Sequence, residues 1–278
     1  MIIFSHANSF PASTYGVLFK SLRARGFSVK AIEKFGHDPN YPVSDNWPHL
    51  VQQLIDFTRA EAAKANQPVY LVGHSLGGFI SLMAAALAPE LVRAVVLIDS
   101  PILGGWRATT LGVIKGAQLV GSFSPGATSR RRRISWASQA EALEHFRHKK
   151  VFARWHPQVL QDYVAHGTHD EGHGTELRRV LSFDRSVETV LYNTLPDNLD
   201  QLLKRHPLRC PAAFIGGTHS AEMKQVGIAM TERICRGRMT MIEGSHLFPM
   251  EKPLATAAAI EAALLGMQEG VETLKRPR

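Results

Sequence analysis

Apolar residues along the chain fall into two alternating patterns: short continuous runs and longer stretches with helical spacing. The short runs are partly β-branched and end at glycine, proline or polar residues, which is typical of buried strands. These runs predict strands over residues 2–4, 27–32, 69–72, 92–98, 210–216 and 239–242. The helical spacing predicts helices over residues 13–25, 47–65, 77–88, 220–235 and 254–267. This alternation indicates an α/β fold with a doubly wound, mainly parallel sheet of about six strands.

The alternation breaks between residues 101 and 208, where the sequence is basic, rich in His and Trp, and helical in pattern. We therefore expect an α/β core of residues 1–100 and 209–278, with 101–208 inserted as a helical cap over the carboxyl ends of the strands. Its large aromatic side chains are expected to pack between the cap helices. They are Trp106, Trp136, Phe146, Phe152 and Trp155.

The composition is that of an ordinary globular protein. Of the 278 residues, 45% are hydrophobic and 20% charged, which excludes a disordered chain. The only cysteines, Cys210 and Cys235, exclude a disulfide scaffold; we expect two reduced thiols, with a single bridge as the alternative. No apolar run approaches the ~20 residues of a membrane span. The first residues lack signal-peptide features, so a soluble cytoplasmic protein is expected.

The net charge of +8 is concentrated in the middle of the sequence. Residues 100–209 hold 16 Lys and Arg against 10 Asp and Glu, and the densest run is Arg130–Arg133. Such a run can attract nucleic acid, an anionic lipid or an acidic substrate. No basic stripe interleaved with aromatic residues supports a nucleic-acid groove, so a solvated helix face is expected and no nucleic-acid partner.

The strongest chemical signal is Gly-His-Ser-Leu-Gly at residues 73–77, a G-x-S-x-G pattern between an expected strand and an expected helix. A serine on such a tight turn is held in strained backbone geometry, and the glycines remove Cβ atoms that would clash there. This predicts Ser75 as a nucleophile, with the Leu76 amide pointing to a developing oxyanion. The alternative is a glycine-rich turn with a capping serine.

A serine hydroxyl needs an adjacent base at neutral pH. Of the 13 histidines, His246 lies in the loop after the last expected strand, within Gly-Ser-His-Leu-Phe-Pro, and completes the chain order Ser, acid, His. We therefore expect His246 to be the general base. His74 neighbours the nucleophile but is expected to point away from it and to brace the turn.

Residues 73–78 and 244–249 resemble the α/β-hydrolase family, and Ser-His-Ala-Asn-Ser-Phe-Pro at 5–11 is similar to its His-Gly-x-Pro oxyanion loop. Matched position by position, the resemblance implies Ser75 as nucleophile, His246 as base, and an oxyanion hole of the Leu76 and Asn8 backbone amides. An Asx turn after the first strand is the alternative role for Asn8.

The sequence departs from the family pattern in two places. The oxyanion loop begins at residue 5, so the expected sheet lacks the family's first two strands. The usual Gly-x-x-Asp acid is absent after the strand at 210–216. Asp99, at the end of an earlier strand, is the preferred replacement and would hold the base in the correct tautomer. Glu222 is the alternative acid, and a cap on the turn into Pro101 is the alternative role for Asp99.

A metal site is suggested only by residues 166–174, which hold three histidines and two carboxylates. The segment is polar and glycine-rich and is expected to be a surface loop, because metal ligands need rigid placement. No Cys-x-x-Cys, Walker loop or dinucleotide motif occurs, so neither a metal nor a cofactor is expected.

Together these features predict a serine hydrolase that cleaves a small or medium carboxylic ester, thioester or lactone through an acyl-enzyme on Ser75. A carbon–carbon bond hydrolase or a perhydrolase would use the same triad. The alternative of another class is a non-catalytic relative that binds a ligand, an interpretation supported by the missing Gly-x-x-Asp acid.

Overall fold

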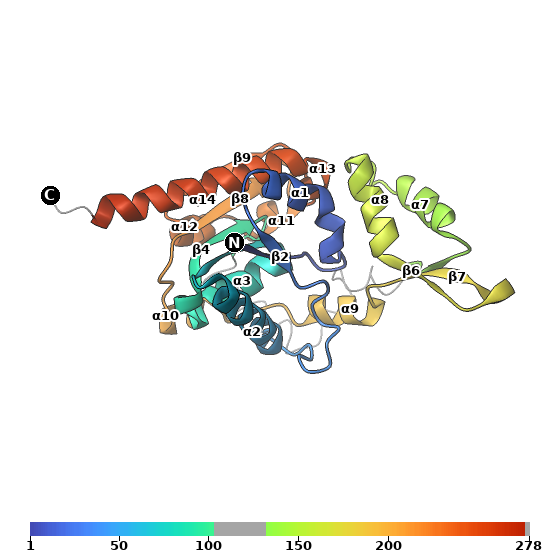
Figure 1. Ribbon diagram of the computed structural model, residues 1–278, viewed down its shortest axis with the longest axis horizontal. Coiled ribbons are helices and arrows are strands. Elements are labelled where there is room, and N and C mark those ends of the chain that lie inside the picture. The colour runs from blue at the N-terminus through green and yellow to red at the C-terminus, as the bar shows by residue number, and fades with distance from the viewer. Residues whose placement is uncertain (103–131, 276–278) are drawn as a thin grey trace.

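Six strands form a parallel sheet at the centre of the protein, whose computed structural model describes residues 1–102 and 132–275 (Figure 1). In spatial order they are β2 (Val29–Ala31), β1 (Ile2–Ser5), β3 (Val69–His74), β4 (Val92–Ile98), β8 (Ala212–Gly217) and β9 (Met239–Ile242). Every pairing between neighbours in this sheet is parallel. The predicted fold class is confirmed, and the carboxyl ends of the strands share one edge of the sheet.

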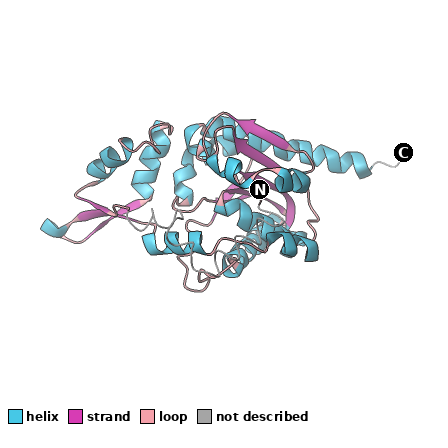
Figure 2. Cartoon of the chain, turned by 180° about the vertical axis from the view of Figure 1, so that it is seen from behind, coloured by secondary structure: helices cyan, strands magenta, loops and turns pink. Residues whose placement is uncertain are grey.

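Helices cover both faces of the sheet, as the views from the two sides show (Figures 1 and 2). Because successive strand residues point to opposite faces, Ile2 and Phe4 pack with one set of helices and Ile3 with the other. The first set is α1 (Gly16–Ala24) and α14 (Pro253–Lys275). The second set is α2 (Pro48–Ala65), α3 (Leu76–Leu87), α10 (Leu199–Arg205) and α12 (Ala229–Cys235). The strands are therefore buried on both sides, which explains their continuous apolar runs.

The helix expected over 220–235 is two helices, α11 (Ala221–Val226) and α12. Gly227 separates them with a φ of +82°, a conformation that favours glycine and ends the first helix. Single short turns complete the core at η1 (Ala12–Tyr15), η2 (Pro89–Leu91) and α13 (Phe248–Glu251).

The sequence pattern had indicated a purely helical segment between β4 and β8, and this prediction is wrong in part, because the described residues also form strands. Its described part holds α7 (Gln139–Arg147), α8 (Pro157–His166), α9 (Arg185–Asn193) and α10, with the short turn η3 (Gly174–Glu176). It also holds a small antiparallel sheet of β5 (Ser135–Trp136), β7 (Arg178–Leu181) and β6 (Thr168–Glu171). Trp106, Arg130 and Arg131 lie outside the described residues.

Strand β6 occupies the segment expected to be a surface loop. Its residues Thr-His-Asp-Glu are mostly exposed and polar, so they carry no alternation of apolar and polar positions. Charge pairing across the ladder stabilises it instead: Glu171 lies opposite Arg178, at 2.8 Å, and Asp170 opposite Arg179, at 3.3 Å. The pairing of β6 with β7 therefore could not be predicted from the sequence without knowledge of their register.

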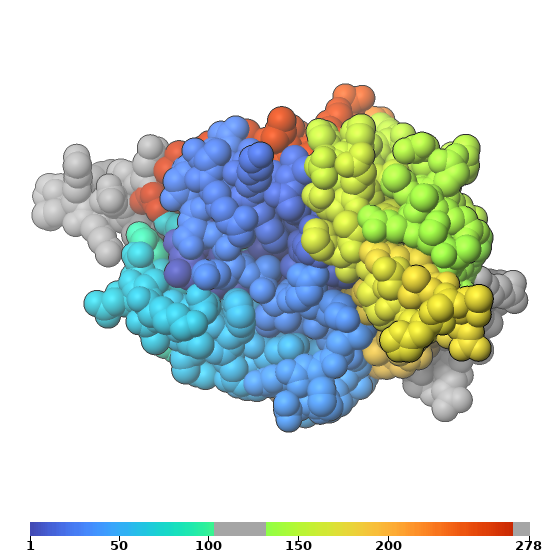
Figure 3. Space-filling model, turned by 45° about the vertical axis from the view of Figure 1, so that its right-hand side comes forward, coloured from blue at the N-terminus to red at the C-terminus, as the bar shows by residue number. Residues whose placement is uncertain are grey.

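The inserted segment packs beside the loop that follows β1. Trp136, Phe146, Phe152 and Trp155 are buried and their rings contact one another in that order, as expected for packing inside the insertion. The Tyr163 ring packs against Phe146 and Trp155. The ring of Phe10, from that loop, lies 5.4 Å from the Trp155 ring. Figure 3 shows the green and yellow surface of the insertion against the blue surface of the N-terminal residues.

Both cysteines, Cys210 and Cys235, are free thiols, as preferred from the sequence. Burial raises the pKa of each to about 12, so both stay protonated at neutral pH. Among the described residues, no helix is long and apolar enough to cross a membrane.

Candidate active site

Ser75 lies on the turn between β3 and α3, with φ +54° and ψ −118°. Its amide donates a hydrogen bond to the Ile98 carbonyl of the neighbouring strand, at 2.9 Å. The turn requires glycine on both sides: a Cβ at Gly73 would clash with the backbone of Gly77, and a Cβ at Gly77 with the backbone of Ser5. The sequence therefore holds this serine in a strained conformation at the carboxyl edge of the sheet.

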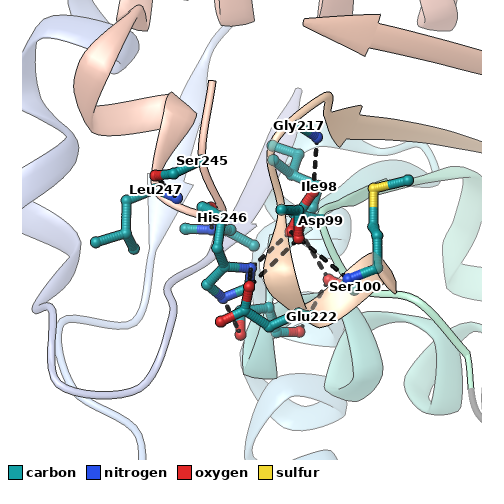
Figure 4. A network of polar contacts seen from close by, with 12 residues as sticks. Ile98, Asp99, Ser100, Gly217, Glu222, Ser245, His246 and Leu247 are labelled. Carbon is teal, nitrogen blue, oxygen red and sulfur yellow. Dashed lines mark hydrogen bonds and ion pairs between the residues drawn. The ribbon is translucent and has the colours of Figure 1, made fainter. Parts of the chain in front are cut away.

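His246 meets Ser75 across the sheet edge, although 171 positions separate them along the chain. It lies in the loop between β9 and α13, and its Nε2 is 3.0 Å from the Ser75 Oγ. Its Nδ1 is 2.6 Å from Oδ2 of Asp99 (Figure 4). Because a carboxylate only accepts, Nδ1–H donates to Asp99, which leaves Nε2 free to accept from the serine hydroxyl. The structure thus brings the three sequence-predicted residues into one hydrogen-bonded line.

Asp99 follows β4 and is fully buried. Oδ1 accepts a hydrogen bond from the Gly217 amide at 2.7 Å, and Oδ2 accepts one from the Ser220 hydroxyl at 2.6 Å. Both oxygens are therefore held while Oδ2 also faces the imidazole. This arrangement fixes the direction of the carboxylate and compensates for its removal from water.

Glu222, the alternative acid, lies nearby but less closely. Its Oε2 is 3.7 Å from Nδ1 of His246, and its side chain is 46% exposed. The distance is too long for a hydrogen bond, so Glu222 acts on the imidazole through its charge.

The pKa of His246 is raised above its ordinary value of 6.5. Burial alone would lower this pKa, because it disfavours the charged imidazolium. The hydrogen bond to Asp99 and the charges of Glu222 and Asp99 outweigh that effect. The carboxylates of Asp99 and Glu222 thus stabilise the protonated form of His246.

The backbone amides of Leu76 and Asn8 were expected to form the oxyanion hole. Leu76 is the first residue of α3, so its N–H points out of the helix start and has no intrahelical acceptor. Asn8 is buried in the loop after β1, the strand next to β3. Its side-chain Nδ2 donates to the Glu188 carbonyl at 3.1 Å, and its Oδ1 accepts no hydrogen bond from a described residue. An Asx turn is therefore not found at Asn8.

Ser220 and Gly217, which hold Asp99, were not predicted from the sequence. The available signal was the spacing Gly217-x-x-Ser220, because Ser220 stands where the family's Gly-x-x-Asp pattern has its aspartate. Its hydroxyl also caps α11, accepting from the Met223 amide at 3.1 Å. Tyr15 was also missed, and its hydroxyl lies 2.8 Å from Nδ1 of His74.

Asp99, Glu222 and His246 are also the one group among the described residues whose ligand atoms, all within 4.8 Å of one another, could hold a metal ion. In the observed arrangement Nδ1 carries the proton that faces Asp99, and both Asp99 oxygens accept hydrogen bonds. A metal here would have to displace that proton, so the geometry fits a base better than a resident metal.

Comparison with known proteins decides the family. A model of the alpha/beta hydrolase family matches residues 2–259. The chain belongs to this family. This alpha/beta hydrolase is 25% identical over 172 residues to a monoglyceride lipase homolog of Monkeypox virus, covering 58% of this chain and 62% of the relative. It is 24% identical over 261 residues to a serine hydrolase-like protein of Dictyostelium discoideum, covering 88% of this chain and 69% of the relative.

The fold of this alpha/beta hydrolase is also similar to solved structures. The thioesterase domain from the curacin biosynthetic pathway superposes with a TM-score of 0.68 at 18% identity, covering 93% of this chain and 90% of the other. At that identity the likeness supports the fold. Family membership and the hydrolase names of the relatives together support a hydrolase.

Proposed function

We propose that this family member is a serine hydrolase that forms an acyl-enzyme on Ser75 and cleaves a small or medium carboxylic ester, thioester or lactone. The observation that carries the proposal is the line from Ser75 Oγ to His246 Nε2, at 3.0 Å, and from His246 Nδ1 to Asp99, at 2.6 Å. A nucleophile, a base and a group that orients the base are thus in hydrogen-bonding contact, which is the arrangement that activates a serine.

In the proposed reaction, His246 Nε2 takes the proton of Ser75 as Oγ attacks the substrate carbonyl carbon. The Leu76 and Asn8 amides stabilise the negative oxygen of the tetrahedral intermediate. His246 then gives its proton to the leaving oxygen or sulfur, and the acyl group stays on Ser75. A water molecule, deprotonated by His246, attacks the acyl-enzyme, and the proton returns to Ser75 as the acid leaves. Asp99 stabilises the imidazolium and holds its tautomer.

The cap assignment belongs to the same proposal: residues 101–208 cover the site, and residues 1–100 with 209–278 form the core. Two contacts support it. The Asn8 side chain donates to the carbonyl of Glu188 in α9, and the His156 amide donates to the carbonyl of Met250 in α13, at 2.9 Å. The described part of the insertion therefore contacts the loop after β1 and helix α13, which follows the His246 loop. A cover at this place would exclude water from the reaction.

Relatives guide the choice of substrate bond. The viral relative is named as a monoglyceride lipase homolog, and the similar solved structure is a thioesterase domain, so oxygen esters and thioesters are the first substrates to test. The non-catalytic alternative is disfavoured, because Asp99, 2.6 Å from His246 Nδ1, can supply the carboxylate that the Gly-x-x-Asp pattern lacks.

The test combines turnover with covalent labelling. We expect the protein to hydrolyse p-nitrophenyl acetate or butyrate, with acyl thioesters and lactones assayed in parallel, and a fluorophosphonate probe to label Ser75. Ser75→Ala is expected to lose at least about 10³-fold in kcat and all labelling. Ser28→Ala, at an exposed serine, is the control and should retain both. Labelling and turnover that persist in Ser75→Ala would overturn the proposal.

A further inference from the structure

A series of three hydrogen bonds connects the loop after β1 with His74, the neighbour of Ser75, and with His246. The Ala7 amide donates to the Tyr15 hydroxyl at 3.1 Å, the Tyr15 oxygen lies 2.8 Å from His74 Nδ1, and His74 Nε2 lies 2.9 Å from the His246 carbonyl oxygen. Ala7, Tyr15 and His74 are each 3% exposed or less. From the sequence alone, His74 is expected only to brace the turn at Ser75.

The direction of each hydrogen bond follows from the groups at its two ends. A backbone carbonyl only accepts, so His74 Nε2 carries the proton that faces His246. A neutral imidazole then has an acceptor at Nδ1, to which the Tyr15 hydroxyl donates. Burial lowers the pKa of His74 well below its ordinary value, and the nearby His246 charge lowers it further, so this ring stays neutral. Every donor in the series faces an acceptor.

The series joins three loops that the proposed reaction needs together. Ala7 precedes Asn8 in the loop after β1, His74 precedes Ser75 at the end of β3, and His246 lies after β9. In the sheet, β1 and β9 are separated by β3, β4 and β8, so they share no ladder hydrogen bonds that could set the distance between their loops. The Tyr15–His74 pair provides a direct link between them.

We propose that Tyr15 and His74 are positioning residues that hold the Asn8 amide and the His246 imidazole in place around Ser75, an inference that rests on the proposed function. The Tyr15 ring has a separate role in the core, since it packs 4.7 Å from the Phe4 ring. Removing the hydroxyl alone therefore separates positioning from packing.

Tyr15→Phe is the decisive variant. It keeps the ring and leaves the Ala7 amide without its acceptor and His74 Nδ1 without its donor. We expect kcat for a p-nitrophenyl ester to fall about 10–100-fold, as displacements of catalytic groups by an ångström or less do, while KM stays within about threefold. Rates are normalised to the folded fraction and to fluorophosphonate-titrated sites.

Tyr70→Phe is the matched control. Tyr70 is also buried, belongs to the same core cluster, lies on the same strand as His74, and its hydroxyl accepts a hydrogen bond from Gln268 away from the site. If the Tyr15 hydroxyl had only a structural role, both variants would lose stability and both would keep the wild-type kcat. A Tyr15→Phe enzyme with the kcat of Tyr70→Phe would overturn the inference.

His74 offers an independent test if Tyr15→Phe does not fold. His74→Gln retains a donor and an acceptor and is expected to keep at least about ten times the kcat of His74→Leu, which has neither. Equal kcat in these two variants would refute the positioning role. Both outcomes are separate from the proposed function, which fails only if wild type is inactive or Ser75→Ala remains active.

Discussion

Asp99 faces His246 at 2.6 Å from a backbone held in the left-handed region, with φ +43°. This conformation costs a non-glycine residue about 1–2 kcal/mol, and aspartate is among the residues that adopt it. The hydrogen bonds from Gly217 and Ser220 to the side chain offset this cost. The strain is thus confined to the point where the carboxylate must turn toward the imidazole, as expected for a functional residue.

We predict that Asp99→Asn lowers kcat by about 10³–10⁴-fold, because an amide cannot hold His246 in the required tautomer. Glu222→Gln is expected to lower kcat by less than about tenfold, since Glu222 makes no hydrogen bond to the ring. The measurement is ester hydrolysis by variants of confirmed fold. A larger loss in Glu222→Gln than in Asp99→Asn would assign the acid to Glu222.

The pH dependence of kcat/KM is predicted from the raised pKa of His246. The imidazole must be neutral to accept the Ser75 proton, so activity rises with pH through this pKa. Its midpoint is therefore expected above 6.5. Glu222→Gln removes one of the charges that raise the pKa and is expected to move the midpoint to lower pH. Glu243→Gln, at an exposed carboxylate paired with Lys252, is the control. An unchanged midpoint in Glu222→Gln would contradict the charge effect.

Much of the core was predictable because its signals are local. Buried parallel strands give continuous apolar runs, and the turn at Ser75 needs glycines at fixed spacing, so both could be recognised in the sequence. The strand at Thr168–Glu171 could not, because its polar residues show no alternation with apolar ones and its cross-strand partners, which include Arg178 and Arg179, are known only from the register.

The sequence was enough to predict the reacting residues of the candidate site, but not the residues that hold them in place. Ser75, His246 and Asp99 each follow a strand of a parallel sheet, and such positions converge on one edge. Ser220 and Tyr15 act through side-chain hydrogen bonds to residues 121 and 59 positions away along the chain. The spacing Gly217-x-x-Ser220 marks the position of Ser220 but not its contact with Asp99, and no periodicity or short motif marks Tyr15.

The free energy of unfolding is predicted to fall in mild acid because of His6 and His74. Burial lowers the pKa of His6 to about 4 and that of His74 well below 6.5. The unfolded chain binds these protons below pH ~6.5 and the native protein does not, so stability decreases as the pH falls from about 6.5 toward 4. His6 alone contributes up to about 3 kcal/mol of this loss. His246, whose pKa is raised, changes stability in the opposite direction.

Urea denaturation at pH 7.5, 5.5 and 4.5 measures this loss. His6→Gln is expected to flatten the pH dependence, whatever its effect on stability at pH 7.5. His173→Gln, at an exposed histidine, should leave the slope as in wild type. A wild-type slope in His6→Gln would show that His6 does not account for the acid sensitivity.

Among the Lys and Arg ion pairs of the described residues, the pair between Arg132 and Glu188 is predicted to be the most costly to break. The two groups are 2.9 Å apart, their side chains are only 19% and 7% exposed, and Arg132 also donates to the Tyr163 hydroxyl. Glu188→Gln removes the charge but keeps the shape, leaving a buried guanidinium without a counter-charge, and is expected to lower the free energy of unfolding by about 3 kcal/mol.

Glu171→Gln is the control. It breaks the pair between Arg178 and Glu171, whose side chains are 60% and 52% exposed, respectively, and should cost less than about 1 kcal/mol. Urea denaturation followed by tryptophan fluorescence compares the two variants. Equal losses would show that burial does not strengthen the Arg132–Glu188 pair.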